Sequence, residues 1–263
     1  MKFTKMNGLG NDYIYINETE IDIENPSNLA IKLSDRHFGV GGDGIVLIKK
    51  SEKDDFRMRM FNSDGSESEM CGNAVRCVAK YVFDKGLTDK TTVKIETLAG
   101  IKEVELKIID NNARFATVNM GYPMFMEHEI VTVDALDGTF FGYKVSVGNP
   151  HFVIFVEDFW DGMMRYGENL SNNTAVFPQR TNVEFAKIID EKHIEMRVYE
   201  RGTGETLSCG TGAIAVFFAA NAVKNVDSVA EIRLPGGKLL CSKTDKGYLL
   251  SGEVETNFEG EIQ

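Results

Sequence analysis

The sequence lacks the features that mark several classes of protein. No run approaches the roughly 20 apolar residues of a membrane span, and the N-terminus carries no apolar core of signal-peptide length. Basic residues are in the minority, since 29 lysines and arginines against 40 aspartates and glutamates give a net charge of −11. Such a surface repels the phosphates of nucleic acids and anionic lipids. We therefore expect a cytoplasmic protein with neither a nucleic-acid nor a membrane partner.

Cysteine and histidine are also scarce, with four of each. No C-x-x-C pair occurs and the histidines are scattered, so the sequence does not support a metal site. Structural disulfides are not expected in a reducing compartment. Each cysteine is therefore either a small buried hydrophobe or a reactive thiol. The four are Cys71, Cys77, Cys209 and Cys241.

The 263 residues are 43% hydrophobic, enough for one large domain or two small ones, and no long linker or low-complexity segment divides them. Short β-branched and aromatic runs between Gly, Asn and Asp clusters predict strands. Three segments predict helices, and the last two are apolar on most sides, which indicates that each runs through the middle of a domain. We predict an α+β fold in which sheets wrap around a central helix. The predicted helices are Asn28–Asp35, Asn73–Lys85 and Thr211–Val223, and the predicted strands include Tyr13–Ile16, Gly44–Ile48, Thr92–Glu96, Val145–Val147, Phe152–Val156, Glu195–Val198 and Ala230–Leu234.

The sequence also repeats itself at an offset of 138 residues, as in 209 − 71 = 138. The matching pairs are Gly10-Asn11 with Gly148-Asn149, Met58–Asn62 with Met196–Glu200, Glu67 with Glu205, and Cys71-Gly72 with Cys209-Gly210. Because helix patterns follow both Cys-Gly pairs, we interpret the repeat as an internal duplication. It predicts two pseudo-symmetric halves, which would meet a ligand from opposite sides of a shared cleft.

Both Cys-Gly pairs stand where a turn-like segment passes into a predicted helix. The unpaired N–H groups and partial positive charge of a helix start can hold a carboxylate and stabilise a thiolate. An amino acid bound between two such starts would have one thiol on each side of its α-carbon. A thiolate that removes the α-proton and a thiol that delivers one invert the stereocentre, and N–H donors stabilise the carbanion without a cofactor. The predicted carboxylate donors are the N–H groups of Gly72, Asn73, Gly210 and Thr211.

The two remaining cysteines, Cys77 and Cys241, have no partner in the repeat. We expect both to pack in the core, as free cysteines usually do.

Eight motifs, in order over nearly the whole chain, resemble those of the diaminopimelate epimerase family. They are Asn7-Gly-Leu-Gly-Asn-Asp12, Gly41-Gly-Asp-Gly44, Phe61-Asn-Ser-Asp-Gly65, Met70-Cys-Gly-Asn73, Gly148-Asn-Pro-His151, Thr181-Asn-Val183, Tyr199-Glu-Arg-Gly202 and Ser208-Cys-Gly-Thr-Gly212. The resemblance implies a cofactor-independent isomerase that interconverts LL- and meso-diaminopimelate in lysine and peptidoglycan precursor synthesis. It also implies two α/β halves, each a sheet closed around a helix, with the final segment returning to the first half. The expected halves are therefore 1–112 with 255–263, carrying Cys71, and 113–254, carrying Cys209.

The resemblance further implies roles for individual residues. Substrate-binding positions are Asn11, Gly44, Asn62, Asn149, Asn182, Glu200 and Arg201, and the auxiliary catalytic residues beside Cys71 and Cys209 are His151 and Glu200. Arg201 suits the distal carboxylate because a guanidinium presents a planar fork. Some family members carry a glutamine contact at position 44, which Gly44 either loses or supplies from its backbone. The family's homodimer uses a tyrosine where this chain has Phe258, whose ring can pack but which lacks the hydroxyl.

Three other functions fit parts of the pattern. A two-cysteine racemase of the same fold would act on proline, glutamate or histidine. A thiol redox protein would cycle its cysteines through a reversible disulfide. A non-catalytic amino-acid binder would leave the α-proton unexchanged with solvent.

Overall fold

The computed structural model describes residues 1–19, 21–127 and 130–262. The chain forms two compact units: unit 1 comprises Met1–Asn119 and the segment from Ser251 onward, and unit 2 comprises Met120–Leu250. The boundaries predicted from the sequence, 112/113 and 254/255, lie a few residues away from these. The difference arises because strand β8 (Asn112–Asn119) completes a hairpin with β7 (Gly100–Ile109) and so stays in unit 1.

Unit 1 contains strands, an outer helix and a central helix. Strand β1 pairs with β19 and β2, β2 runs parallel to β3, and β3 continues through β4 to β6, β7 and β8. Besides β7 and β8, unit 1 contains β1 (Lys2–Gly8), β2 (Asn11–Asn17), α1 (Pro26–Ser34), β3 (Gly44–Lys50), β4 (Phe56–Asn62), β5 (Glu67–Ser68), α2 (Gly72–Asp84), β6 (Thr92–Thr97) and β19 (Glu255–Glu261).

Unit 2 repeats this plan. Strand β11 pairs with β12, β12 runs parallel to β13, and β13 continues through β14 to β16 and β17. Its elements are β9 (Met124–Phe125), β10 (Val131–Ala135), β11 (Gly138–Ser146), β12 (Pro150–Phe155), α3 (Met163–Ser171), β13 (Asn182–Asp190), β14 (His193–Glu200), β15 (Gly204–Thr206), α4 (Gly210–Val223), β16 (Val229–Leu234) and β17 (Gly237–Thr244), with β18 (Gly247–Glu253) leading back to unit 1.

The predicted duplication extends to strand register. Tyr13 pairs with Gly44 in unit 1, and the residues 138 positions later, His151 and Asn182, pair in the same parallel fashion in unit 2. The apolar residues under the outer helices follow the same offset. They are Ile14, Ile16, Ile45, Leu47 and Phe61 in unit 1, and Phe152, Ile154, Val183, Phe185 and Tyr199 in unit 2. The predicted α+β class with two similar halves is confirmed.

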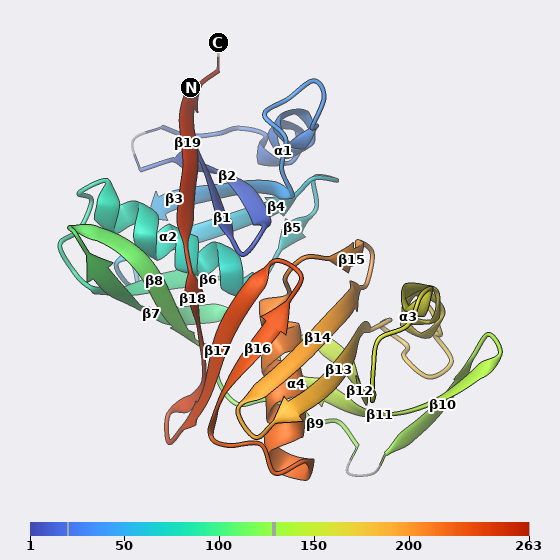
Figure 1. The fold of residues 1–263 in the computed structure, drawn as a ribbon. Coiled ribbons are helices and arrows are strands. Elements are labelled where there is room, and N and C mark those ends of the chain that lie inside the picture. The colour runs from blue at the N-terminus through green and yellow to red at the C-terminus, as the bar shows by residue number, and fades with distance from the viewer. Residues whose placement is uncertain (20, 128–129, 263) are drawn as a thin grey trace. The chain divides into compact units, whose positions relative to one another are not determined.

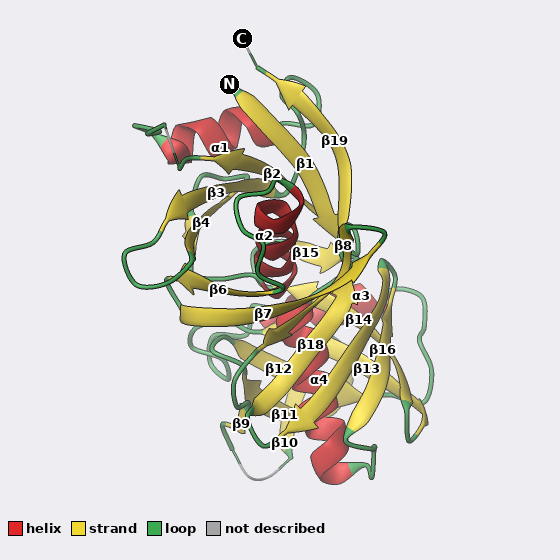
Figure 2. Cartoon of the chain, turned by 90° about the vertical axis from the view of Figure 1, so that its left-hand side faces the viewer, coloured by secondary structure: helices red, strands yellow, loops and turns green. Residues whose placement is uncertain are grey.

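A buried helix runs through each unit. Figure 2 shows α2 enclosed by strands, and every residue from Gly72 to Val82 is buried. In unit 2, α4 contacts β11, β12, β13, β16 and β17, and Figure 1 shows it behind β13 and β14. Fully burying one of their valine or isoleucine side chains stabilises the fold by about 1.5–3 kcal/mol. Among the described residues, none of the helices combines the length and the apolar content needed to cross a bilayer.

Helix α3 was not predicted from the sequence. Glycine disfavours helix interiors, and Gly167 lies inside α3. The glycine is needed for packing, since a Cβ there would lie 2.9 Å from the Cβ of Tyr199. The repeat could have predicted this helix. Shifting α1 by 138 residues gives 164–172, which differs from α3 by one position. The three predicted helices lie within two residues of α1, α2 and α4.

Candidate active site

Cys71 lies at the start of the central helix of unit 1. It is the N-cap of α2, in extended backbone with φ −131° and ψ 126°, and is half-buried. Its carbonyl accepts from Val75 N at 2.9 Å, the first bond of the helical ladder. The N–H groups of the first turn of a helix have no intrahelical acceptor and point toward the cap. The predicted position of this thiol at a helix tip is therefore confirmed.

Asn11 connects this thiol to a group of charged side chains. Cys71 Sγ donates to Asn11 Oδ1 at 3.3 Å, and Asn11 Nδ2 donates to Asp43 Oδ2 at 2.8 Å. Burial, followed by the nearby charge of Asp12, raises the pKa of Asp43. Burial also acts to raise the pKa of Asp12, but the hydrogen bond from Arg36 and the charge of Lys5 outweigh it and lower that pKa. Asn11 is thus held by the Asp43 carboxylate on one side and accepts from the Cys71 thiol on the other.

A buried arginine stands one turn into α2. Arg76 has no exposed surface, and its guanidinium donates to Asn73 Oδ1 at 2.7 Å and to Gly72 O at 3.2 Å. Sequence analysis did not select Arg76, although a cation within an otherwise apolar helical stretch is a visible signal. Its bond to Asn73 fixes that side chain beside the guanidinium.

Two other predicted residues of unit 1 lie at strand ends. Asn62 Nδ2 donates to Ser66 Oγ at 3.0 Å, within the turn after β4. Gly44 is buried between β2 and β4, where an added Cβ would stand 2.0 Å from the carbonyl oxygen of Phe61 and 2.8 Å from Cε1 of Tyr13. This position therefore cannot hold a glutamine without moving backbone, and any contact from it comes from the main chain.

Cys209 occupies the equivalent place in unit 2. It is the N-cap of α4, with φ −129° and ψ 107°, and only 5% of its surface is exposed. Its Sγ accepts from Gly212 N at 3.4 Å, so the sulfur itself caps the helix. Asn182 Nδ2 points to the same sulfur at 4.0 Å. The helix-tip position predicted for this second thiol is confirmed as well.

His151 links a buried carboxylate to the start of α4. Its Nδ1 lies 2.6 Å from Glu184 Oε1, and its Nε2 lies 3.0 Å from Asn149 Oδ1. Asn149 Nδ2 in turn donates to Thr211 Oγ1 at 3.3 Å, in the first turn of the helix. His151, Asn149 and Thr211 were all selected from the sequence, whereas Glu184 was not. A charged residue inside an apolar strand, two positions after Asn182, was the signal that could have found it.

Acidic side chains set the charge around Cys209. Burial, followed by the charges of Glu200 and Glu184, raises the pKa of the Cys209 thiol well above its ordinary value. Burial also raises the pKa of Glu200, although Thr206 Oγ1 donates to its Oε1 at 2.5 Å and opposes the shift. A neutral thiol is therefore the favoured state of Cys209.

Arg201 lies at the edge of this group. Its backbone N donates to Asn182 Oδ1 at 3.0 Å, while its exposed guanidinium donates to the carbonyl of Gln179 at 2.7 Å. The remaining N–H groups of its fork face solvent, where they can pair with a carboxylate.

The other two thiols are buried, as predicted for packing residues. Cys77 and Cys241 have no exposed surface, and burial raises the pKa of Cys77 to about 11. Across residues 1–19, 21–127 and 130–262, no group of three or more histidine, cysteine or acidic side chains is placed to hold a metal ion.

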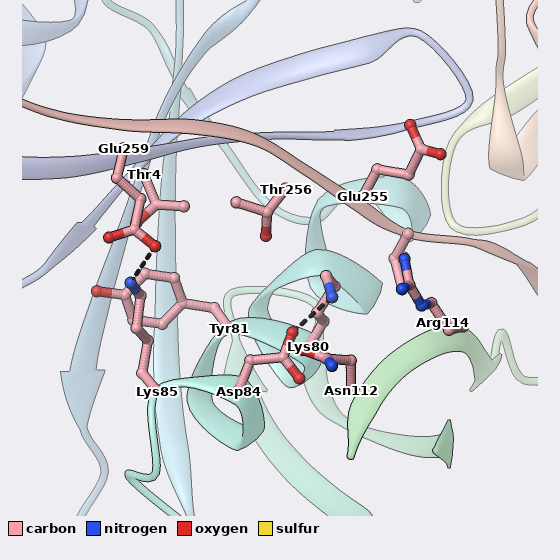
Figure 3. A pocket seen from close by; sticks show the side chains of 11 residues that line it. Thr4, Lys80, Tyr81, Asp84, Lys85, Asn112, Arg114, Glu255, Thr256 and Glu259 are labelled. Carbon is pink, nitrogen blue, oxygen red and sulfur yellow. Dashed lines mark hydrogen bonds and ion pairs between the residues drawn. The ribbon is translucent and has the colours of Figure 1, made fainter. Parts of the chain in front are cut away.

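A polar cavity of about 490 Å³ in unit 1 contains none of these residues (Figure 3). It lies at the far end of α2, roughly 20 Å along the helix from Cys71 at 1.5 Å per residue. Its charged side chains pair with one another, Lys80 with Asp84 and Lys85 with Glu259. The cavity is therefore separate from the cysteine site.

Comparison with known proteins gives consistent matches. The sequence profile described as diaminopimelate epimerase matches residues 3–126 and 143–256. The diaminopimelate epimerase of Acetivibrio thermocellus is 47% identical over 277 residues, covering 100% of this chain and 98% of that protein. That of Methanococcus maripaludis is 46% identical over 275 residues, covering 100% and 99%.

Solved structures with low sequence identity share the fold. A probable proline racemase from Agrobacterium radiobacter K84 has a TM-score of 0.76 at 14% identity, covering 100% of this chain and 92% of that chain. A hydroxyproline epimerase from Agrobacterium vitis has a TM-score of 0.74 at 15% identity, covering 99% and 91%.

Proposed function

The chain belongs to the diaminopimelate epimerase family, and we propose that it interconverts LL- and meso-diaminopimelate by proton transfer at one α-carbon through Cys71 and Cys209. The single observation that carries the proposed mechanism is the pair of equivalent helix starts, each with a cysteine N-cap. Such a start supplies a proton-transfer group and carboxylate-binding N–H donors at the same point.

The reaction in this proposal uses two sulfurs in opposite protonation states. The raised pKa of Cys209 supports a thiol there. Cys71 is then the thiolate of the reacting state, once it has lost the proton that it donates to Asn11 Oδ1. The thiolate takes the α-proton, the electron pair of the broken C–H bond delocalises into the carboxylate, and the Cys209 thiol delivers its proton to the opposite face. The product has the inverted configuration and the two sulfurs have exchanged roles, so the reverse reaction starts from the other state.

The substrate contacts follow from the same arrangement. The N–H groups of Gly72, Asn73, Gly210 and Thr211 bind the α-carboxylate and stabilise the charge that develops on it. Asn11 and Asn149 are equivalent positions in the two units, and each contacts the first turn of a central helix through Cys71 or Thr211. The exposed fork of Arg201 binds the distal carboxylate, with Asn62 and Asn182 as further polar contacts. His151 and Glu200 orient these groups and set the charge around Cys209.

We also propose the wider setting of this activity. The reaction belongs to lysine and peptidoglycan precursor synthesis in the cytoplasm, without a cofactor. The homodimer is proposed through β19, where Phe258 is half exposed and packs edge-on against Phe3 at 6.0 Å between ring centroids. Light scattering of Phe258→Ala beside the parent protein tests this, and an unchanged dimer would remove Phe258 from the interface.

Incubation with LL-diaminopimelate in heavy water tests the proposed reaction. Chiral analysis should find meso product, and mass analysis should find one deuterium at the inverted α-carbon. Proline, glutamate and histidine serve as rival substrates in the same assay. Absence of exchange with diaminopimelate, or faster exchange with a rival, would contradict the proposal.

Mild oxidation tests whether the two thiols approach one carbon. In the proposal they are close enough in the empty, closed state to form a Cys71–Cys209 disulfide, which should abolish activity until a reductant is added. Activity that persists after complete oxidation of both thiols would contradict the two-thiol mechanism.

A further inference from the structure

A buried carboxylate that sequence analysis did not select lies directly behind the second cysteine. Glu184 has no exposed surface, and its Oε1 meets His151 Nδ1 at 2.6 Å. A Cβ built on Gly212 would stand 2.9 Å from that same oxygen and 3.2 Å from Cys209 Sγ. The carboxylate and the thiol therefore face the same first turn of α4.

The His151 imidazole also connects Glu184, through Asn149, to the start of α4. Nε2 of His151 faces Asn149 Oδ1, while the Asn149 amide nitrogen is directed to the hydroxyl of Thr211. Both ring nitrogens thus face oxygens, Nδ1 the Glu184 carboxylate and Nε2 the Asn149 amide oxygen, so each nitrogen has an acceptor within hydrogen-bond distance. A chain of four side chains runs from Glu184 to the predicted carboxylate-binding turn.

The other unit shows that the fold does not require this pair. The residues at the same register in unit 1 are Tyr13 and Val46, since 151 − 138 = 13 and 184 − 138 = 46, and both are buried. Removing a charge from water is costly, and apolar residues of similar volume often serve stability equally well. Unit 1 makes the same strand pairing with an apolar residue, so the fold itself does not require a carboxylate at this position.

Building on the proposed function, we propose that Glu184 is a positioning residue for the epimerase reaction. Its carboxylate fixes the His151 ring through Nδ1, so that the ring holds Asn149 toward Thr211, and places a negative charge beside the Cys209 sulfur. The charges that act on that sulfur include Glu184 on β13 and Glu200 on β14, and His151 on β12 pairs with Glu184. The charge of Glu184 is among the causes that raise the pKa of Cys209, consistent with a role in keeping this thiol protonated.

The test replaces the carboxylate in three ways. Glu184→Gln keeps an oxygen for Nδ1 but removes the charge, Glu184→Val installs the residue that unit 1 uses at this register, and Glu184→Asp keeps the charge. We expect kcat to fall at least tenfold in the first two, with partial recovery in the aspartate variant. The alkaline limb of kcat/KM should move to lower pH in Glu184→Gln, since removing a negative charge makes the thiolate of Cys209 easier to form.

A matched control comes from unit 1. Glu18 is also a buried carboxylate with one oxygen that lacks a hydrogen-bond partner, and its other oxygen pairs with Lys49 at 3.0 Å. Glu18→Gln removes the same kind of charge without touching either cysteine, and should leave kcat and the pH profile unchanged. Folded Glu184→Gln and Glu184→Val proteins with kcat within twofold of the parent and an unmoved alkaline limb would overturn the proposal.

A second readout does not depend on turnover. Nitrogen NMR reports the protonation of the His151 ring, whose signals are assigned by their loss in His151→Tyr. We expect both ring nitrogens to be protonated in the parent protein, and the protonation of the ring to change in Glu184→Gln. Equal ring spectra in the two proteins would overturn the positioning role even if the enzyme is active. Failure of the proposed function is distinguishable, because the parent protein would then show no α-proton exchange whatever the ring spectra show.

Discussion

Helices α2 and α4 begin alike, each with a cysteine in extended backbone followed by glycine, but the side chains around the two sulfurs differ in charge. Near Cys71 the buried charge one turn into the helix is the cation Arg76. Near Cys209 the buried charges include the carboxylates of Glu184 and Glu200, which raise its pKa. The comparison teaches that the duplicated fold supplies two equivalent helix starts, while different residues at a few inward positions give each thiol its own charged surroundings.

The largest effect should come from removing either sulfur. Cys71→Ala and Cys209→Ala should each lower the epimerisation rate by about 10²- to 10⁴-fold, the usual contribution of a positioned acid or base. Chiral analysis of product measures this. Cys77→Ala serves as the control, since that thiol is buried within α2, and should keep most of the activity. A Cys71 variant as active as the Cys77→Ala control would contradict the two-thiol mechanism.

Replacing Gly44, which unit 1 has where unit 2 has Asn182, should lower the stability of the protein. Gly44→Ala places a Cβ against the backbone oxygen of Phe61, and overpacking of this kind costs about 1–3 kcal/mol of stability. The reverse change at the equivalent position of unit 2, Asn182→Gly, removes a buried side chain and should cost about 1 kcal/mol while raising KM. Denaturant unfolding measures both. A Gly44→Ala protein as stable as the parent would contradict the close strand approach at Gly44.

The two thiols should differ in reactivity. Cys209 is buried and its pKa is raised well above the usual value, so little thiolate exists at neutral pH, whereas Cys71 is half-buried. Iodoacetamide at pH 7 should label Cys71 about tenfold faster or more, since the thiolate is the nucleophile. Peptide mass analysis over time gives the rates, with unfolded protein as the reference in which both cysteines react alike. Raising the pH should narrow the gap, because Cys209 then gains thiolate.

The smallest effect concerns an ion pair that both units share. Arg59 Nε donates to Glu67 Oε1 at 2.7 Å, and the equivalent Arg197 Nε donates to Glu205 Oε1 at 2.8 Å. These pairs are partly exposed, so replacing either arginine by alanine should cost about 0.2–1 kcal/mol. Arg59 also stacks on the ring of Phe61 at 4.9 Å, so its loss should be the larger. Thermal unfolding of the two variants under one condition measures the difference.

Local patterns were sufficient to predict the central helices and both cysteine positions. A Cys-Gly pair before an apolar helical stretch identifies an N-cap, because only the helix start combines a turn-forming approach with an apolar continuation. The 138-residue repeat then predicted equivalent halves, and α3 shows that the repeat was more informative than helix propensity. A glycine such as Gly167 lowers propensity for a packing reason that only the folded chain reveals.

The charges around the thiols were harder to predict. Arg76 and Glu184 are buried in elements whose other residues are mostly apolar, and nothing in one sequence states which partners compensate them. Their roles depend on distances across strands and helix turns, such as the 2.6 Å between Glu184 and His151, that the repeat alone does not specify. A comparison of the two halves position by position would have identified Glu184, because the equivalent residue in unit 1 is Val46.

Strand β19 joins unit 1 by pairing with β1, although the whole of unit 2 separates them along the chain. During synthesis, every residue of unit 2 leaves the ribosome before β19 does. Unit 2, a continuous segment, can thus complete its own sheet while unit 1 still waits for its last strand. Unit 1, most of which is translated first, therefore depends on the last strand of the chain to complete its sheet.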